Sequence, residues 1–173
     1  MIIILIGYMA SGKSTLGKIL AKKLTYEFID LDEYIEIQEK LTVKNIFKTK
    51  GELYFRKAET FYLGELLNTK NNIVLSLGGG TPCYGNNMEM ILQSDLVKSF
   101  YLKASLPHLV DKLKEKKNSR PLISHLETEE ELMEFIGKHL FERSPYYEMA
   151  HIKVSVDDKS KKEIIKELQS FLV

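Results

Sequence analysis

Short apolar runs alternate along the chain with segments whose apolar residues recur every three or four positions. The short runs are typical of strands in a parallel sheet, and we expect five of them, at residues 2–6, 27–30, 73–77, 97–102 and 152–156. The periodic segments predict helices at residues 13–24, 33–50 (as one or two short helices), 54–67, 106–113, 129–140 and 164–171. This alternation predicts an α/β fold with three layers, in which a five-stranded parallel sheet lies between helices.

The chain is expected to form one domain. It has 173 residues and shows no internal repeat, low-complexity tract or linker, so the prediction covers residues 1–173. Two stretches, residues 31–60 and 114–128, fit the alternation least well. Ligands of such folds bind outside the carboxyl ends of the strands, and we expect both stretches to be mobile elements over that edge.

Charge and residue content narrow the function classes. The chain has 25 basic and 24 acidic residues and a net charge of +1, which favours a small anionic ligand over nucleic acid or a membrane surface. The single cysteine, Cys83, excludes an intrachain disulfide and fits a reducing compartment. The four histidines lack metal-ligand spacing. No segment is apolar enough to span a membrane or has the layout of a signal peptide, so a cytoplasmic location is expected.

Residues 7–15 match the phosphate-binding P-loop pattern. They read Gly-Tyr-Met-Ala-Ser-Gly-Lys-Ser-Thr and lie between the first predicted strand and the first predicted helix. Gly7 and Gly12 allow the torsions that turn backbone N–H groups inward, and the start of the helix adds its positive dipole end. Lys13 offers a positive charge to the transferring phosphoryl group, and the Ser14 hydroxyl is a Mg²⁺ ligand. The pattern predicts a site for a nucleoside triphosphate and Mg²⁺.

The acid that completes a magnesium site is not where ATPase motors and GTPases normally carry it. The predicted strand at residues 73–77 ends in three glycines and has no carboxylate. No guanine-reading Asn-Lys-x-Asp sequence is present, which favours adenine. Asp30, at the end of the second predicted strand, is the nearest candidate for the metal-side acid.

Asp30 and Asp32 place two carboxylates at alternate positions where a strand leaves the sheet. One would help to hold Mg²⁺, and the other would accept the hydroxyl proton of a phosphoryl acceptor. The alternative interpretation is structural, with Asp32 as the N-cap of a helix that starts at Glu33. The residues alone leave both interpretations open.

A helical pair and a glycine triplet add candidate residues for the second substrate. Arg56 and Glu59 share one face of a predicted helix, where a surface ion pair is the simpler interpretation. The neighbouring Phe55 indicates a partly buried guanidinium, which suits bidentate binding of a carboxylate. The triplet Gly78–Gly80 lets a ligand approach the backbone N–H groups closely.

Two further arginines follow. Arg120 lies in a polar stretch and precedes Pro121, and it is expected to close over the phosphates and neutralise charge in the transition state. Arg143 and Tyr147 lie four residues apart near a predicted helix end. Taken singly, each arginine is more typical of a solvated surface residue, so its interpretation depends on the whole set.

The order of these motifs resembles shikimate kinase over essentially the whole chain. The motifs are the P-loop, Asp-x-Asp, Phe-Arg-x-x-Glu, Gly-Gly-Gly, Arg-Pro-Leu and Arg-x-x-x-Tyr. The resemblance implies transfer of the γ-phosphoryl group of ATP to the 3-hydroxyl of shikimate, in the chorismate pathway to aromatic amino acids. ATP and shikimate are then the expected partners, with Mg²⁺ as cofactor and a monomer as the expected state.

The resemblance also implies roles for residues of this chain. It assigns ATP binding to Ala10, Ser11, Gly12, Lys13, Ser14, Thr15 and Arg120, and the magnesium site to Ser14 and Asp30. It assigns shikimate binding to Asp32, Arg56, Gly78, Gly79, Gly80 and Arg143. Asp32 would be the base, with Lys13 and Arg120 as catalytic cations. Residues 31–60 become the shikimate-binding region and residues 114–128 the lid.

The chain departs from the family pattern in two places. Position 10 is Ala where the family often has Gly, at a free position of the P-loop. On the adenine side, residues 112–117 and 156–159 stand where the family often has an arginine and a basic or amide residue, and no adenine-stacking residue can be assigned. The alternatives are a kinase for gluconate or a nucleoside, which would not need Arg56 and Arg143, and a binding module without catalysis. Lys13, Asp32 and Arg120, whose loss would indicate such a module, are all present.

Overall fold

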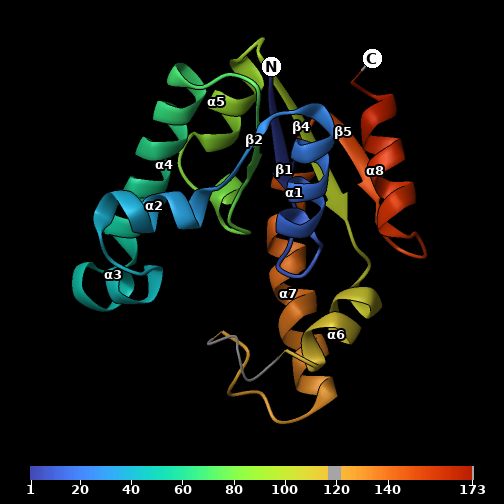
Figure 1. Ribbon diagram of the computed structural model, residues 1–173. Helices are drawn as coiled ribbons and strands as arrows, with labels where there is room; N and C mark the ends of the chain where they lie inside the picture. The colour runs from blue at the N-terminus through green and yellow to red at the C-terminus, as the bar shows by residue number, and fades with distance from the viewer. Residues whose placement is uncertain (117–121, 173) are drawn as a thin grey trace.

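Five parallel strands form a single sheet at the centre of the molecule (Figure 1). The computed structural model describes residues 1–116 and 122–172. The strands are β1 (Ile2–Ile6), β2 (Glu27–Asp30), β3 (Ile73–Ser76), β4 (Val97–Lys103) and β5 (Ile152–Ser155). They lie in the order β2-β3-β1-β4-β5, and all four pairings are parallel. The predicted five-stranded parallel sheet is confirmed.

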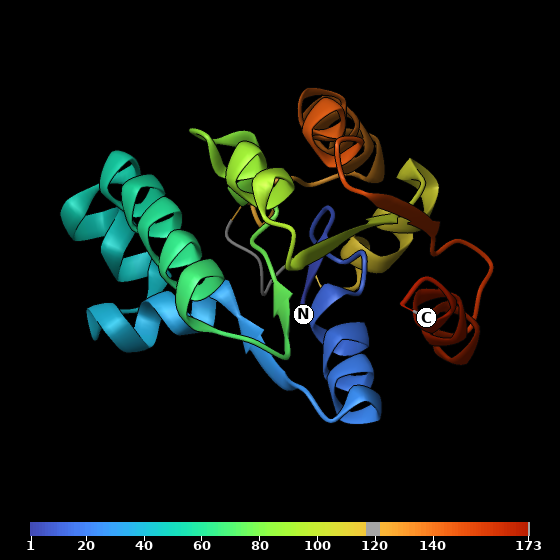
Figure 2. The same ribbon diagram turned by 90° about the horizontal axis from the view of Figure 1, so that it is seen from above.

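Helices cover both faces of this sheet. They are α1 (Lys13–Leu24), α2 (Leu31–Glu39), α3 (Val43–Lys50), α4 (Glu52–Thr69), α5 (Asn87–Gln93), α6 (Leu106–Lys114), α7 (Glu129–Tyr147) and α8 (Lys161–Ser170), with a short 3₁₀ helix η1 (Thr81–Cys83). Figure 2 shows α1 and α8 on one side of the sheet and α5 and α7 on the other, with α2, α3 and α4 grouped beyond β2. The predicted three-layer architecture is therefore confirmed.

The core follows from the apolar runs. All five residues of β1 have no exposed surface, as expected of the central strand of a parallel sheet covered on both faces. On one side α1 buries Leu16 and Leu20, and α8 buries Ile164, Ile165 and Leu168. The strands consequently form a rigid platform, and the loops at their carboxyl ends lie side by side at one edge.

Several elements differ from the sequence prediction, and the differences at α2, at α7 and after the triple glycine bear on the site. Helix α2 begins at Leu31 instead of residue 33, because Asp30 caps it. Helix α7 runs to Tyr147, seven residues past its predicted end, and includes Pro145. The pattern predicts no element after the triple glycine, yet this segment forms η1 and α5. In the described part of the chain, no helix combines the length and the apolar character that a membrane crossing requires.

Candidate active site

The loop between β1 and α1 has the backbone conformation that the glycines predict. Gly7 and Gly12 have φ angles of 153° and 97°, which L-residues rarely adopt. A Cβ on Gly7 would lie 2.9 Å from the Leu102 carbonyl oxygen, so only glycine fits there. Lys13 Nζ donates to the carbonyl oxygens of Gly7 and Tyr8 at 2.8 and 2.9 Å. The lysine charge is thus held at the mouth of the loop.

Asp30 connects this loop with the second strand. Ser14 Oγ donates to Asp30 Oδ2 at 3.0 Å, and Asp30 Oδ1 accepts from the backbone N–H groups of Asp32 and Glu33 at 3.1 and 3.5 Å. Asp30 is therefore the N-cap of α2. The alternative interpretation of Asp32 as the cap is wrong, because Asp32 already lies in the first turn of the helix. Its carboxylate is free of that structural task.

The Asp32 carboxyl group lies in an environment that favours its protonated form. Burial, reinforced by the nearby carboxylates of Asp30 and Glu59, raises its pKa to about 7, while Lys13 and Arg56 oppose the shift. A carboxyl group whose pKa lies near neutral pH is suited to accept a proton from a hydroxyl group. This property belongs to Asp32 because of the groups around it and is not visible in its sequence motif.

The triple glycine after β3 is the point at which three predicted site residues meet. A Cβ on Gly78 would lie 3.1 Å from Asp32 Oδ1. A Cβ on Gly79 would lie 3.1 Å from Arg143 Nη1, and one on Gly80 would lie 2.8 Å from Arg56 Nη1. Side chains at these positions would displace the carboxylate and both guanidinium groups. Each of the three glycines faces a different charged group, so a side chain at any of them would disturb a different predicted site residue.

Arg56 is fixed by a buried ion pair. Its Nη1 donates to Glu59 Oε2 at 2.7 Å, and Glu59 Oε1 accepts from the Thr81 hydroxyl at 2.6 Å. The side chains of Arg56 and Glu59 are only 15% and 1% exposed, so the pair is not the surface pair of the simpler interpretation. Asn87 Nδ2 donates to the Thr81 carbonyl at 2.7 Å and holds the loop. Thr81 and Asn87 belong to the segment that the sequence left unassigned.

Arg143 and Tyr147 reach the same loop from α7. The Tyr147 hydroxyl donates to the Gly79 carbonyl at 2.5 Å, and burial raises the pKa of this phenol. The Arg143 guanidinium carbon lies 5.9 Å from the centre of the Tyr8 ring. The Tyr8 hydroxyl is hydrogen-bonded to His139 Nδ1 at 2.9 Å. Helix α7 thus contacts both the P-loop and the triple glycine.

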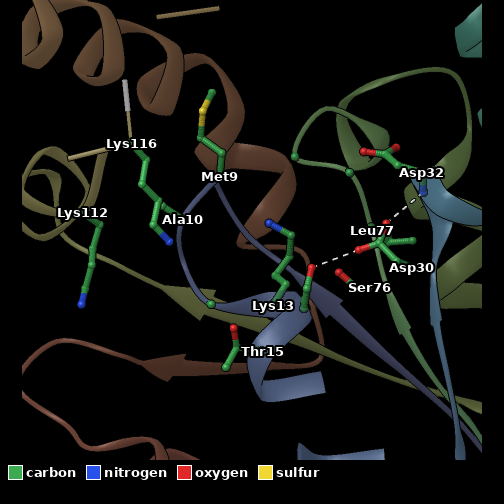
Figure 3. A pocket seen from close by; sticks show the side chains of 14 residues that line it. Met9, Ala10, Lys13, Thr15, Asp30, Asp32, Ser76, Leu77, Lys112 and Lys116 are labelled. Carbon is green, nitrogen blue, oxygen red and sulfur yellow. Dashed lines mark hydrogen bonds between the residues drawn. The ribbon is translucent and has the colours of Figure 1, made fainter. Parts of the chain in front are cut away.

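A cavity of about 300 Å³ opens between these groups. Figure 3 shows Asp30 and Asp32 on one side of Lys13, and Lys112 and Lys116 on the other, beyond Ala10. The cavity is lined by Met9, Ala10, Gly12, Lys13, Ser14, Thr15, Asp30, Asp32, Ser76, Leu77, Gly78, Gly79, Lys112 and Lys116. Nine of these are predicted site residues, which the fold brings together from three strand ends.

The predicted site residues that do not line the cavity are Ser11, Arg56, Gly80, Arg120 and Arg143. Arg56, Gly80 and Arg143 adjoin it at the triple glycine, as described above. Ser11 is 4% exposed, and its Oγ has no hydrogen-bond partner. Arg120 lies outside the described residues. The two lysines Lys112 and Lys116 come from α6 and the turn after it, on the adenine side where the sequence offered no assignment.

Comparison with known proteins decides the family. The family model described as shikimate kinase matches residues 9–173 of this chain. The chain belongs to the shikimate kinase family. A shikimate kinase of Flavobacterium psychrophilum is 47% identical over 170 residues, which cover 98% of each chain.

Solved shikimate kinases have the same fold. The crystal structure of shikimate kinase from Bacteroides thetaiotaomicron has a TM-score of 0.89 at 36% identity, covering 99% of this chain and 97% of that chain. Shikimate kinase from Acinetobacter baumannii, solved in complex with shikimate, has a TM-score of 0.84 at 31% identity, with 99% and 92% coverage. A gluconokinase from Sinorhizobium meliloti has a TM-score of 0.53 at 17% identity and shares the fold alone.

Proposed function

We propose that this chain transfers the γ-phosphoryl group of ATP to the 3-hydroxyl of shikimate. The observation that carries the proposal is the triple glycine, which brings Asp32, Arg56 and Arg143 together beside a P-loop. A phosphate site next to one carboxylate and two arginines suits an acceptor that has a hydroxyl group and a carboxylate. Gluconate also has both groups, so the expectation that a gluconate kinase would not need the two arginines is wrong, and the choice of shikimate rests on membership of the shikimate kinase family.

The phosphoryl donor binds at the P-loop in this proposal. The inward N–H groups of the loop and the start of α1 hold the β- and γ-phosphates, and Lys13 exchanges its two carbonyl partners for phosphate oxygens. The 3.0 Å pair of Ser14 hydroxyl and Asp30 carboxylate is a fitting donor set for Mg²⁺, which prefers oxygen ligands and takes few from the protein. Mg²⁺ would neutralise charge on the phosphates when bound.

The acceptor binds on the other side of the cavity. Arg56 and Arg143 would hold the shikimate carboxylate, since a guanidinium that is already fixed in place loses little entropy on binding. Gly78, Gly79 and Gly80 let the ring approach the backbone closely. Discrimination against uncharged acceptors follows, because they bring no carboxylate to the two guanidinium groups.

Asp32 completes the reaction as the base. The oxygen of the 3-hydroxyl forms a bond to the γ-phosphorus, the bond from that phosphorus to the β,γ-bridging oxygen breaks, and ADP leaves with the bond's electron pair. The hydroxyl proton passes to the Asp32 carboxylate. Lys13 stabilises the charge that develops on the transferring group.

Six further expectations stay predictions. They are the role of Arg120, the lid at residues 114–128, the shikimate-binding region at residues 31–60, the single-domain organisation, the monomeric state and the cytoplasmic location.

An assay of ADP release tests the proposal. Purified protein with Mg·ATP is expected to release ADP when shikimate is added, and not when gluconate or a nucleoside is added. Phosphorus NMR of the reaction mixture should show a phosphate monoester in an amount equal to that of the ADP released. Release of ADP with gluconate and not with shikimate would make the chain a gluconate kinase. Binding of ATP and of shikimate without any release of ADP would make the chain a binding module without catalysis.

A further inference from the structure

The aromatic ring of Tyr84 lies against the Arg56 guanidinium. The guanidinium carbon is 4.0 Å from the centre of the ring, which is the closest cation–aromatic contact in the described part of the chain. Tyr84 follows η1 directly and belongs to none of the motifs that indicated the function. Tyr84 is 38% exposed, and it lies at the edge of the site.

The other contacts of the Arg56 guanidinium are looser or involve a single nitrogen, and the second aromatic ring near it, that of Phe55, has its centre 5.4 Å from the guanidinium carbon. The short bond from Nη1 to Glu59 fixes one nitrogen. The Nε atom is buried and makes no hydrogen bond, because Glu52 Oε1 approaches it only to 3.5 Å. A Cβ on Gly80 would lie 2.8 and 3.0 Å from Nη1 and Nη2, so the missing side chain of Gly80 leaves the space beside both Nη atoms unfilled. The edge that carries both Nη atoms is the one that a carboxylate binds with two hydrogen bonds.

Tyr84 is itself held in place by its neighbours. Its hydroxyl donates to Glu52 Oε1 at 3.2 Å, the same oxygen that lies 3.5 Å from Arg56 Nε. Its carbonyl oxygen accepts from the backbone N–H of Asn87 at 3.3 Å, and Cys83 N–H donates to the Gly80 carbonyl at 2.9 Å. The turn that carries the ring is therefore tied to the triple glycine on one side and to α5 on the other.

We propose that Tyr84 is a positioning residue for the recognition of the acceptor's carboxylate: its ring fixes the plane of the Arg56 guanidinium and so presents both Nη atoms to the acceptor. The inference rests on the proposed function, since it assigns Arg56 to the shikimate carboxylate. Tyr84 acts through Arg56 and touches no reacting atom. A stacked guanidinium gains stabilisation that a hydrogen bond to one nitrogen does not supply.

The variant Tyr84→Leu tests this role. Loss of the ring is expected to raise KM for shikimate by roughly fivefold to thirtyfold, which corresponds to the loss of a cation–aromatic contact worth about 1–2 kcal/mol. KM for ATP should stay unchanged, and kcat should change less than twofold. Tyr84→Phe keeps the ring and loses only the hydrogen bond to Glu52. Its KM for shikimate is therefore expected to stay close to the wild-type value. Tyr146→Leu is the control, because Tyr146 is 41% exposed and lies outside the described contacts of the site.

A double-mutant cycle decides whether the effect passes through Arg56. In an Arg56→Ala background, Tyr84→Leu should change KM for shikimate no further. Equal effects in both backgrounds would overturn the proposal, as would an unchanged KM in Tyr84→Leu. If Tyr84→Leu does not fold, Tyr84→Met gives the same comparison with a longer side chain.

The wild-type assay separates this inference from the proposed function. Wild-type protein without shikimate-dependent ADP release would remove the proposed function. Wild-type activity combined with an unchanged KM in both ring-less variants would remove only the role of Tyr84.

Discussion

At the scale of single residues, the site depends on a carboxyl group that the fold destabilises in its charged form. Asp32 has a pKa of about 7 in place of 3.8, mainly because it is buried. Since the folded pKa lies above the unfolded value, the stabilising contribution of the protonated form is complete below 3.8 and is lost as pH rises to about 7. Above that pH the folded protein carries a buried charge that opposes folding.

The variant Asp32→Asn is therefore expected to lose activity and gain stability. Turnover should fall by orders of magnitude if Asp32 is the base. In buffer with a chelator at pH 8, the free energy of unfolding should rise by up to about 4 kcal/mol, from a shift of about three pKa units at 1.36 kcal/mol each. Urea unfolding at pH 4 and pH 8 measures the gain, which should vanish at the lower pH. Asp95→Asn is the exposed control, and near-normal turnover in Asp32→Asn would rule out the role as base.

Ala10 shows that a position left free by a motif can still be constrained. Its φ angle is 66°, in the left-handed region where a Cβ costs roughly 1–2 kcal/mol. Ala10→Gly should raise the free energy of unfolding by about 0.5–1 kcal/mol, after the extra entropy of glycine in the unfolded chain is subtracted. Ala58→Gly, within α4, should change it in the opposite direction. A urea titration that finds Ala10→Gly destabilised would contradict the prediction.

The residue types in the site could be predicted from the sequence, but their partners could not. The Asp-x-Asp spacing predicted one carboxylate for Mg²⁺ and one that accepts a proton, and left open whether Asp32 instead capped the helix. The deciding contacts are between Asp30 and the N–H groups of Asp32 and Glu33, and they depend on the exact residue at which α2 begins. The stacking of Tyr84 on Arg56 joins residues 28 positions apart and leaves no periodic signal.

At the scale of elements, α2, α3 and α4 are held together at one carboxylate. Glu39, at the end of α2, accepts hydrogen bonds from Lys50 Nζ at 2.8 Å, from Tyr54 at 2.7 Å and from Tyr62 at 2.9 Å. Lys50 lies at the end of α3, and both tyrosines belong to α4. These three helices carry Asp32 and Arg56, so the bonds at Glu39 also fix the relative positions of two site residues.

Glu39→Ala should loosen this group of helices. Three donors lose their acceptor, and we expect the free energy of unfolding to fall by about 1–3 kcal/mol and the amides of α3 to exchange faster with deuterium. Gln38→Ala, at an exposed neighbouring position of α2, is the matched control. Unchanged exchange in α3 would show that apolar packing alone holds it. The affinity for ADP, which binds at α1 in our proposal, should stay the same.

Element prediction succeeded where the apolar pattern was long and failed where single contacts decide. The five strands were predicted to within one residue at either end. Strands β1 and β3 are buried throughout, and β2 and β5, at the two edges of the sheet, bury one residue each. Residues 81–93 gave no periodic pattern, and their structure depends on polar contacts such as the bond from Asn87 to the Thr81 carbonyl. The extension of α7 through Pro145 goes against the usual rule that a proline interrupts a helix.

At the scale of the whole molecule, one edge of the sheet supplies both halves of the site. The loop after β1 is assigned to the nucleotide, and the loop after the neighbouring β3 to the acceptor. Order and spacing of the motifs predicted this arrangement because carboxyl ends of parallel strands meet at one edge. The distances between the two halves depend on α7, whose Arg143 is far from both loops in sequence.

Arg143→Ala should separate the two binding events. In wild-type protein, ADP and shikimate at about 100 times their dissociation constants should each raise Tm by roughly 5–10 °C. The variant should keep the shift with ADP and lose most of the shift with shikimate, because the lost cation lies against Gly79 and meets the P-loop only at the Tyr8 ring, 5.9 Å away. Differential scanning fluorimetry measures both. If the variant kept its Tm shift with shikimate, recognition of the carboxylate would have to be assigned to Arg56 alone.

Tyr8 has a consequence for how this lineage can change. Its carbonyl accepts from Lys13, and its hydroxyl is bonded to His139, one helical turn before Arg143. The P-loop pattern admits any residue at position 8, yet here a phenol requires a polar partner 131 residues away. A homologue in which Tyr8 is replaced by Phe no longer needs an imidazole at position 139. If the imidazole is lost first, however, the buried Tyr8 hydroxyl is left without its hydrogen-bond partner. We therefore expect positions 8 and 139 to covary among homologues, with the substitution at position 8 preceding the one at position 139.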